Sequence, residues 1–308
     1  MNETAERAKI YTLSDLADTL AAEHAAADKA LAEGRNLGPS IKFPRLANEM
    51  LGYWPPGVTG LHATPGAGKS AFGIECVLSA DCPAIYLTSE MSATTVLRRM
   101  IACETGEFMG NLARGKISAS GISAKAAALA TKHPQVGIIA ANTAPCPADL
   151  LRSVCERMRT HDRHMLLAVD SLHAWASAIA PEAEEYQAIS AGMEALRRLA
   201  ADLNVSVLAI IERNRASMKD GGLSAGASSR KIEYSAEAIL ELQYVAEGRV
   251  NLRFAKNRNG RAGVTIGYTF DGATQRFNEV GDSWPTGRVP KSNGRSAHLD
   301  EEPEELLA

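Results

Sequence analysis

Hydrophobic residues along this chain alternate between short continuous runs and longer stretches in which they recur every three or four positions. The short runs predict five buried strands, at 57–63, 83–89, 136–141, 165–170 and 205–211. Helical spacing lies between them, near 70–79, 93–104, 147–160 and 182–203. Because strands and helices alternate, the sequence predicts an α/β fold, with a mostly parallel twisted sheet and helices on both faces.

The flanks of this region carry different patterns. Residues 13–33 predict an Ala-rich helix with Thr12 as its N-cap, whose thin apolar stripe suggests packing on something outside itself. Three late strands, at 238–243, 249–255 and 264–269, are expected to form antiparallel hairpins at the edge of the sheet. We therefore expect an N-terminal helical segment at 1–35, one α/β domain at 36–280 and a tail at 281–308.

The amino-acid composition indicates the cellular compartment of the protein. The five cysteines form no CxxC pair and leave one unpaired, which favours a reducing compartment over a zinc site or a disulfide framework. No apolar run reaches the length of a membrane helix, and the N-terminus has no signal-peptide pattern, so a cytoplasmic protein without a membrane partner is expected. The tail holds three basic and six acidic residues, which match the net charge of −3, and is expected to be disordered.

The stretch from Ala63 to Ser70 reads A-T-P-G-A-G-K-S, close to the phosphate-binding pattern G-x-x-x-x-G-K-[ST]. It follows a predicted strand and opens a predicted helix, as a phosphate-binding loop (P-loop) does. Lys69 is expected to reach the β- and γ-phosphates of ATP, and the Ser70 hydroxyl to bind Mg²⁺. The expected nucleotide contacts are Ala63, Thr64, Pro65, Gly66, Ala67, Gly68, Lys69, Ser70 and Ala71.

Two acids at strand ends are candidates for the hydrolytic chemistry. Asp170 closes the apolar run MLLAVD, where a carboxylate can hold Mg²⁺ through water. Glu90 follows the strand after the P-loop helix, so its carboxylate should emerge beside the γ-phosphate and orient the attacking water. The plainer alternatives are an acid that caps a turn and an edge glutamate without a role.

Segments beyond the P-loop resemble a known family. SEMSATTVLRRMIA (89–102) and AKNRNGRAGVTIGYTFDGATQRF (255–277) are similar to parts of DnaB-type replicative helicases, which are RecA-like ATPases. IERNR (211–215) and SRKIEYSAEAILEL (229–242) fall where that family has a sensor strand and a DNA-binding loop with its strand. The resemblance covers roughly residues 36–279 and implies a RecA-like ATPase domain.

The resemblance also implies roles for single residues. Glu90 would be the catalytic glutamate, and Lys256 and Arg258 would be basic fingers that reach the γ-phosphate bound by a neighbouring subunit. Glu212 stands where the family generally has a glutamine that senses this phosphate, so the acid is expected to need a base such as Arg213 or Arg215 to neutralise it.

The family resemblance further implies assembly. It predicts a homo-oligomer, in the form of a hexameric ring, with a primase or a helicase loader as a further partner. The family's helical N-terminal domain is expected to be absent from this chain, and the helix at 13–33 would correspond to the linker helix that docks on the adjacent subunit.

Residues 213–231 are the candidate nucleic-acid loop, because they hold five basic residues against one acid. Without an aromatic residue, the loop favours contact with the backbone of single-stranded DNA over base stacking. The candidate DNA contacts are Arg215, Lys219, Arg230 and Lys231. The loop after Asp170 is acidic and is not expected to bind DNA, and its Trp175 is expected to serve packing or an interface.

Three functions fit these patterns. The first is an ATP-hydrolysing, ring-forming DNA helicase motor that acts on single-stranded DNA in replication of the plasmid or phage type. The second is a RecA-like ATPase of recombination or repair that does not unwind processively. The third is an ATP-switched assembly module whose partners do the work.

Overall fold

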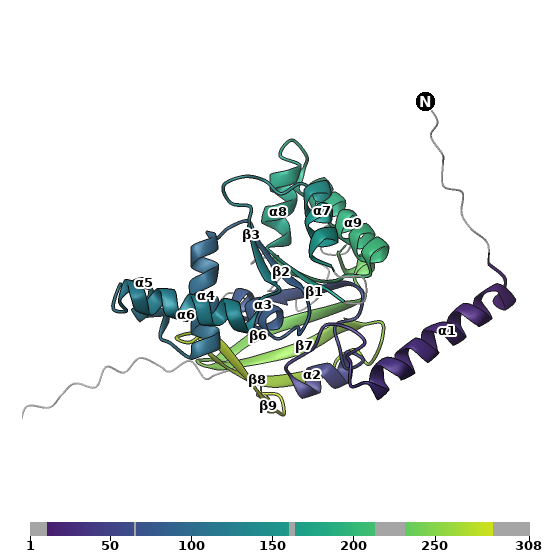
Figure 1. Cartoon of the computed structure of the whole chain (residues 1–308), viewed down its shortest axis with the longest axis horizontal. Coiled ribbons are helices and arrows are strands. Elements are labelled where there is room, and N and C mark those ends of the chain that lie inside the picture. Colours follow the sequence, from purple (N-terminus) through teal and green to yellow (C-terminus); the bar gives the residue numbers. More distant parts are fainter. Residues whose placement is uncertain (1–10, 65, 160–163, 213–231, 286–308) are drawn as a thin grey trace, which may run out of the picture.

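The computed structural model of the 308-residue chain describes residues 11–64, 66–159, 164–212 and 232–285. Within them, nine strands form one sheet in the order β3-β2-β4-β5-β1-β6-β7-β8-β9 (Figure 1). The strands are β1 (Gly57–Ala63), β2 (Ala84–Thr88), β3 (Val136–Ala140), β4 (Leu166–Asp170), β5 (Ser206–Glu212), β6 (Ala238–Ala246), β7 (Arg249–Asn257), β8 (Thr265–Asp271) and β9 (Arg276–Gly281). The strands from β3 to β6 in this order are parallel, and β7 to β9 continue the sheet antiparallel. This confirms the predicted fold class.

Helices cover both faces of the parallel part of the sheet. One face packs on α3 (Lys69–Leu78) and α4 (Ala93–Thr105), and the other on α7 (Ala148–Met158), α8 (Leu172–Ile179) and α9 (Glu185–Leu203). Strand residues alternate between these two cores, so that Leu166 belongs to the first and Leu167 to the second. Apart from β3, whose residues are half-buried, the parallel strands are thus largely buried on both sides, which explains their continuous apolar runs.

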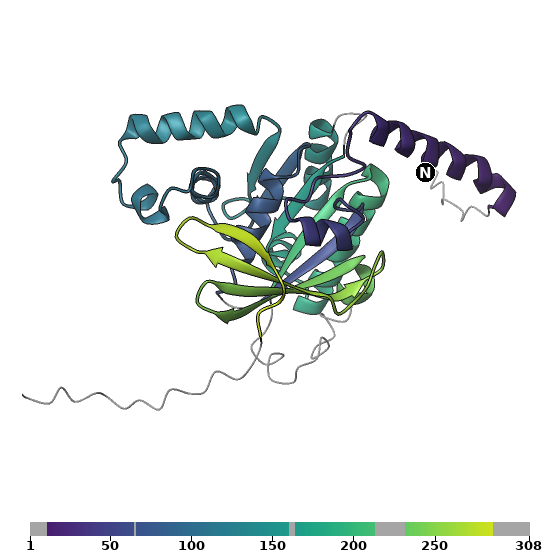
Figure 2. The same cartoon turned by 90° about the horizontal axis from the view of Figure 1, so that it is seen from below.

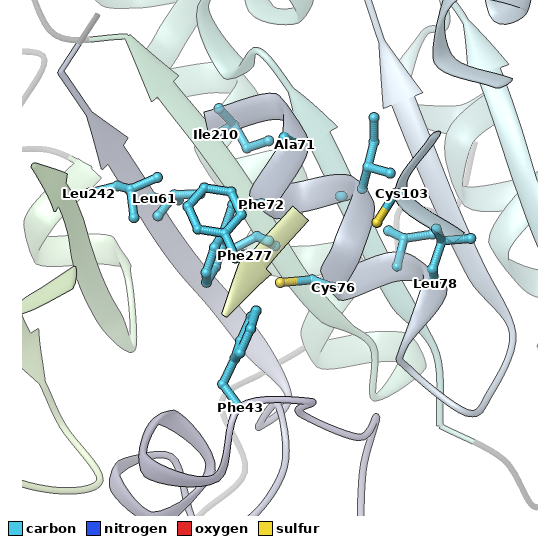
Figure 3. Packing of buried hydrophobic residues seen from close by; sticks show 14 of the residues in the cluster. Phe43, Leu61, Ala71, Phe72, Cys76, Leu78, Cys103, Ile210, Leu242 and Phe277 are labelled. Atoms are coloured by element: carbon cyan, nitrogen blue, oxygen red, sulfur yellow. The ribbon is translucent and has the colours of Figure 1, made fainter. Parts of the chain in front are cut away.

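Aromatic rings hold the P-loop helix α3 against the antiparallel strands. Phe72 of α3 stacks on Phe43 and meets Phe277 edge-on, with ring centroids 5.5 and 5.3 Å apart. Figure 3 shows these rings gathered around α3 with Leu61 of β1. Glu75 of α3 is 2% exposed; it accepts a hydrogen bond of 2.9 Å from the Phe277 backbone N–H and pairs with Lys42. The helix that begins at the P-loop is therefore fixed at both its apolar and its charged side.

Several elements are missing from the sequence prediction. They are the helices α2 (Pro44–Glu49), α5 (Met109–Ala113), α6 (Ala119–Lys132) and α8, and the strand β9. The sequence predicts a loop after Asp170, but the Ser171 hydroxyl accepts from the Ala174 N–H at 3.3 Å and begins α8. Trp175 of α8 is fully buried and its Nε1 donates to the Cys146 carbonyl at 2.8 Å, so the packing role predicted for it is confirmed.

The N-terminal helix forms as predicted, as α1 (Leu13–Ala32), and stands away from the sheet in both views (Figures 1 and 2). Thr12 and Asp15 make a reciprocal capping box of 2.8 and 3.2 Å. The leucine side chains of α1 remain exposed, with exposed fractions from 43% at Leu16 to 91% at Leu13. Among the residues that the structure describes, no helix is long and apolar enough to cross a membrane.

Candidate nucleotide-binding site

The register of the parallel strands brings the P-loop and the three predicted acids together at the carboxyl ends of these strands. Thr88 of β2 lies beside Asp170 of β4, and Ala63 of β1 lies beside Glu212 of β5. Glu90 follows two residues after Thr88. The carboxyl ends of parallel strands are where α/β sheets bind ligands, because the loops there converge on the helix N-termini. Three acids and the P-loop therefore share this end of the strands.

The P-loop has the backbone shape that a phosphate cradle needs. Gly66 and Gly68 adopt left-handed φ angles of 82° and 84°, and Gly68 caps α3. A Cβ at Gly68 would lie 2.8 Å from the Phe270 ring, so a side chain does not fit there. Thr64 ties the loop to β6, since its N–H donates to the Leu242 carbonyl at 3.0 Å and its hydroxyl accepts from the Tyr244 N–H at 2.9 Å.

The remaining P-loop residues follow the β1–α3 path. Ala63 is 6% exposed at the end of β1, so the alanine in place of the first glycine is accommodated within the core. Ala67 and Ala71 are buried under the loop, and Pro65 lies outside the described residues. The loop therefore presents backbone N–H groups and the N-terminus of α3, which together attract anions.

Tyr86 lies between Asp170 and the backbone of Ser70. Its hydroxyl donates to Asp170 Oδ2 at 2.5 Å and lies 3.4 Å from the Ser70 carbonyl oxygen. Burial, and then the negative charge of Asp170, raise the pKa of the Tyr86 phenol well above its ordinary value, so it remains a donor at neutral pH. The buried carboxylate of Asp170 and the hydroxyl of Ser70 in the first turn of α3 are oxygen ligands of the kind that Mg²⁺ takes together with phosphates. These residues fit a Mg²⁺ site.

Glu90 has the environment of a general base. Its Oε1 accepts a hydrogen bond of 2.9 Å from the Ser171 hydroxyl, which holds the carboxylate toward the end of β4. Partial burial, and then the nearby charges of Glu212 and Asp170, raise its pKa, against the opposing effect of the Ser171 hydrogen bond. A carboxylate with a raised pKa takes a proton more readily than an ordinary one.

Glu212 forms an ion pair with the P-loop lysine. Its Oε1 lies 3.0 Å from Lys69 Nζ, and this hydrogen bond is the main cause of the lowered pKa of Glu212. The backbone N–H of Glu212 donates to Nδ1 of His173 at 3.4 Å, and burial lowers the pKa of that histidine. The base that neutralises Glu212 is thus Lys69, whereas the expected partners Arg213 and Arg215 lie outside the described residues.

Lys256 and Arg258 lie at the opposite end of the strands, toward the amino end of β1. Asn257 pairs with Ala238, and Ala238 pairs with Thr59, four residues before the P-loop end of β1. At ~3.3 Å per residue, Asn257 is displaced by about 13 Å along the strands from the start of the chain's own P-loop, and Lys256, which pairs with Ile239 opposite Gly60, by about 10 Å. Lys256 Nζ donates to the carbonyls of Glu233 and Ala236, at 2.5 and 2.6 Å. Arg258 pairs with the Glu237 carboxylate at 3.0 Å and donates to the Tyr234 carbonyl at 3.1 Å.

The chain matches one protein family over most of its length. Residues 38–279 correspond to the DnaB-like helicase C terminal domain. The chain belongs to this family. Membership identifies it as an ATPase domain of the DnaB-like helicase type, as the resemblance in the sequence predicted.

Individual relatives of this DnaB-like domain are distant. The replicative DNA helicase DnaB of Leifsonia xyli subsp. xyli is 25% identical over 272 residues, which cover 80% of this chain and 57% of that protein. DnaB of Treponema pallidum is 27% identical over 225 residues, which cover 70% of this chain and 50% of that protein. The chain thus spans about half the length of the curated relatives it matches.

Solved structures share the fold. A solved ATPase domain aligns with a TM-score of 0.73 at 19% identity, over 87% of this chain and 99% of that chain. A DnaB-like replicative helicase, whose structure was described with its interactions with primase, aligns with a TM-score of 0.70 at 19% identity, over 87% and 67%. The RadB recombinase aligns less closely, with a TM-score of 0.52 at 14% identity, over 77% and 96%.

Three residues of this DnaB-like site were not found from the sequence. Tyr86, Ser171 and His173 contact Asp170, Glu90 and the Glu212 backbone respectively, from β2 and from the start of α8. The position of Ser171 directly after Asp170 is a sequence signal that could have revealed its role. The contact of Tyr86 depends on strand register, and that of His173 depends on α8. The candidate DNA contacts Arg215, Lys219, Arg230 and Lys231 all lie outside the described residues.

Proposed function

We propose that the chain is the ATP-hydrolysing motor of a DnaB-like helicase that acts on single-stranded DNA as a homo-oligomeric, hexameric ring. The observation that carries this proposal is that the P-loop and the Lys256–Arg258 pair lie at opposite ends of the neighbouring strands β1, β6 and β7. Both basic residues lie far from the P-loop of their own chain, which supports a role at the nucleotide of a neighbouring copy.

Each residue at the P-loop end of the strands has a part in this mechanism. The P-loop N–H groups and Lys69 would bind the phosphates, and Ser70 directly and Asp170 through water would hold Mg²⁺. Mg·ATP supplies an electrophilic terminal phosphate when it is bound. Glu90, held by Ser171, would orient a water molecule and take its proton. Lys256 and Arg258 of the adjacent copy would stabilise the charge that develops on the phosphate oxygens.

The arrangement of the chain supports assembly through its N-terminus. We take residues 1–35 as a linker, 36–280 as the motor and 281–308 as an acidic tail, in a cytoplasmic protein. The exposed leucines of α1 would dock on the adjacent copy, because burial of apolar side chains stabilises an interface.

DNA would run along Arg215, Lys219, Arg230 and Lys231. A primase or a helicase loader is a further partner, and replication of plasmid or phage type is the setting.

The proposal is tested by the ATPase rate per subunit as a function of protein concentration, with and without single-stranded DNA. A rate that rises with concentration and again with DNA is expected for a motor whose sites are completed by neighbouring copies. A rate that is independent of both contradicts the proposal and favours an ATP-switched assembly module. Unwinding of a forked duplex with ATP separates a helicase from a recombination ATPase that binds DNA without processive unwinding.

A further inference from the structure

The lysine that the P-loop offers to phosphate is already engaged. Lys69 Nζ lies 3.0 Å from the Glu212 carboxylate, within the reach of a charge-assisted hydrogen bond. Glu212 is held in place by its backbone, since its neighbour across the sheet is Ala63, at the start of the P-loop. Its N–H is further bonded to His173. The side chain is 45% exposed, and that of Lys69 is 29% exposed, so both ends of the pair face solvent.

We propose that Glu212 is a latch on Lys69 that competes with the phosphates of the nucleotide and must be displaced for the nucleotide to bind. A carboxylate oxygen and a phosphate oxygen accept the same hydrogen bonds from an ammonium group. Glu212 is thus a positioning residue that acts through Lys69. This inference rests on the proposed nucleotide site and adds a regulatory step to it.

The charges around the pair favour displacement over shared binding. Glu90, Asp170 and Glu212 lie at adjacent strand ends, and their negative charges repel a polyphosphate as well as one another. A phosphate that took Lys69 while Glu212 stayed in place would add to this repulsion. Because the pair is partly exposed, it is weak enough to exchange, and the Glu212 side chain has solvent to move into.

The latch sets a threshold for ligands. A single free phosphate offers Lys69 little more than Glu212 already provides. A nucleoside triphosphate with Mg²⁺ gains further contacts from the P-loop N–H groups, from Ser70 and from the ligands of the metal, so it can displace the carboxylate. Because each ligand must displace the same contact, the latch should weaken binding of Mg·ATP and of inorganic phosphate by a similar factor, and only the ligand with the further contacts still binds at low concentration.

The test is calorimetric titration of the full chain with Mg·ATPγS, Mg·ADP and inorganic phosphate. Glu212→Gln removes the negative charge with little change of size, and Glu212→Ala removes the contact with Lys69 altogether. The matched control is Glu194→Gln, which loses one charge from the ion pairs of α9 with Arg197 and Arg198. Both changes at Glu212 should tighten ATPγS binding about three- to tenfold, and less at high salt. The control should bind as the unmodified chain does.

The direction of the change decides the outcome. Unchanged or weaker ATPγS binding in both Glu212 variants, with folding verified by circular dichroism, overturns the latch and makes Glu212 neutral or a direct contributor to binding. If the unmodified chain binds neither nucleotide at millimolar concentration, the nucleotide site itself fails. A loss of binding in the Glu194→Gln control would overturn the assignment of the effect to Lys69.

Discussion

Some residues near the P-loop can be identified from a local sequence pattern, whereas the contacts of others are visible only in the folded structure. Lys69 and Asp170 were found because each stands at a fixed place in a motif or at a strand end. The partner of Glu212 could not be found in this way, because Lys69 lies 143 residues away along the chain. Contacts of this kind depend on which strands are neighbours, and several strand orders are compatible with the same sequence pattern.

The two glycines of the P-loop should respond differently to alanine. Both have left-handed φ angles, which cost an L-residue about 1–2 kcal/mol. At Gly66 nothing lies within 4 Å of an added Cβ, whereas at Gly68 it would meet the Phe270 and Phe277 rings at 2.8 and 2.9 Å. Gly68→Ala should therefore lose about 1–3 kcal/mol more stability than Gly66→Ala. Urea denaturation measures both, and equal losses would contradict the predicted contact.

Among the elements, the long apolar runs were the most predictable and the short amphipathic ones the least. The parallel strands β1, β2, β4 and β5 are largely buried on both faces, so their runs are continuous and easily recognised, whereas β3 is half-buried. β9 has only Phe277 in the core and is defined by its pairing with β8 and by the Glu75 carboxylate. α8 occupies only the first part of the segment after Asp170 that the sequence predicts to be a loop. Its buried residues Leu172, Trp175 and Ala176 form a short apolar pattern, and the acidic residues that follow made the whole segment resemble a loop.

Glu75 shows how one buried acid joins two elements. Glu75→Ala would leave the Phe277 N–H without an acceptor and Lys42 without its carboxylate. We expect a loss of about 2–4 kcal/mol in the free energy of unfolding, because an unsatisfied buried donor and a lost side chain both destabilise the protein. Glu194→Ala, whose side chain is 40% exposed on the outer side of α9, is the matched control, with an expected change within about 0.5 kcal/mol. Similar values for the two variants in thermal or urea unfolding would refute this role.

At the scale of the whole molecule, the two groups of candidate site residues lie at opposite ends of the strands. The P-loop, Glu90 and Asp170 lie where the parallel strands end, and Lys256 and Arg258 lie beside the start of β1. The sequence placed these residues in the chain but could not place them relative to one another, because the direction of β7 follows from its antiparallel pairing with β6. The separation is a property of topology, which no single segment contains.

Mixed assemblies test whether the two ends meet. Arg258→Ala chains retain Glu90 and lack the proposed finger, and Glu90→Gln chains retain the proposed finger and lack the proposed base. Each variant alone should hydrolyse ATP at least about 100-fold more slowly than the unmodified chain. Mixing them should restore part of the rate, because some interfaces then combine an intact Glu90 with an intact Arg258. The ATPase rate across mixing ratios is the measurement, and Lys69→Ala mixed with Glu90→Gln is the control, since both changes disable the same end. No regain at any ratio would exclude a shared site.

The opposed ends also give every copy of the chain a front and a back. Copies that meet front to back form a heterologous interface, which either closes into a ring or continues as an open spiral. In a closed ring every pocket has a neighbour. A ring that opens at one seam leaves one pocket without its basic pair and one basic pair without a pocket, whatever the number of subunits. Opening to admit a strand of nucleic acid would therefore silence one hydrolytic site and leave all the others complete.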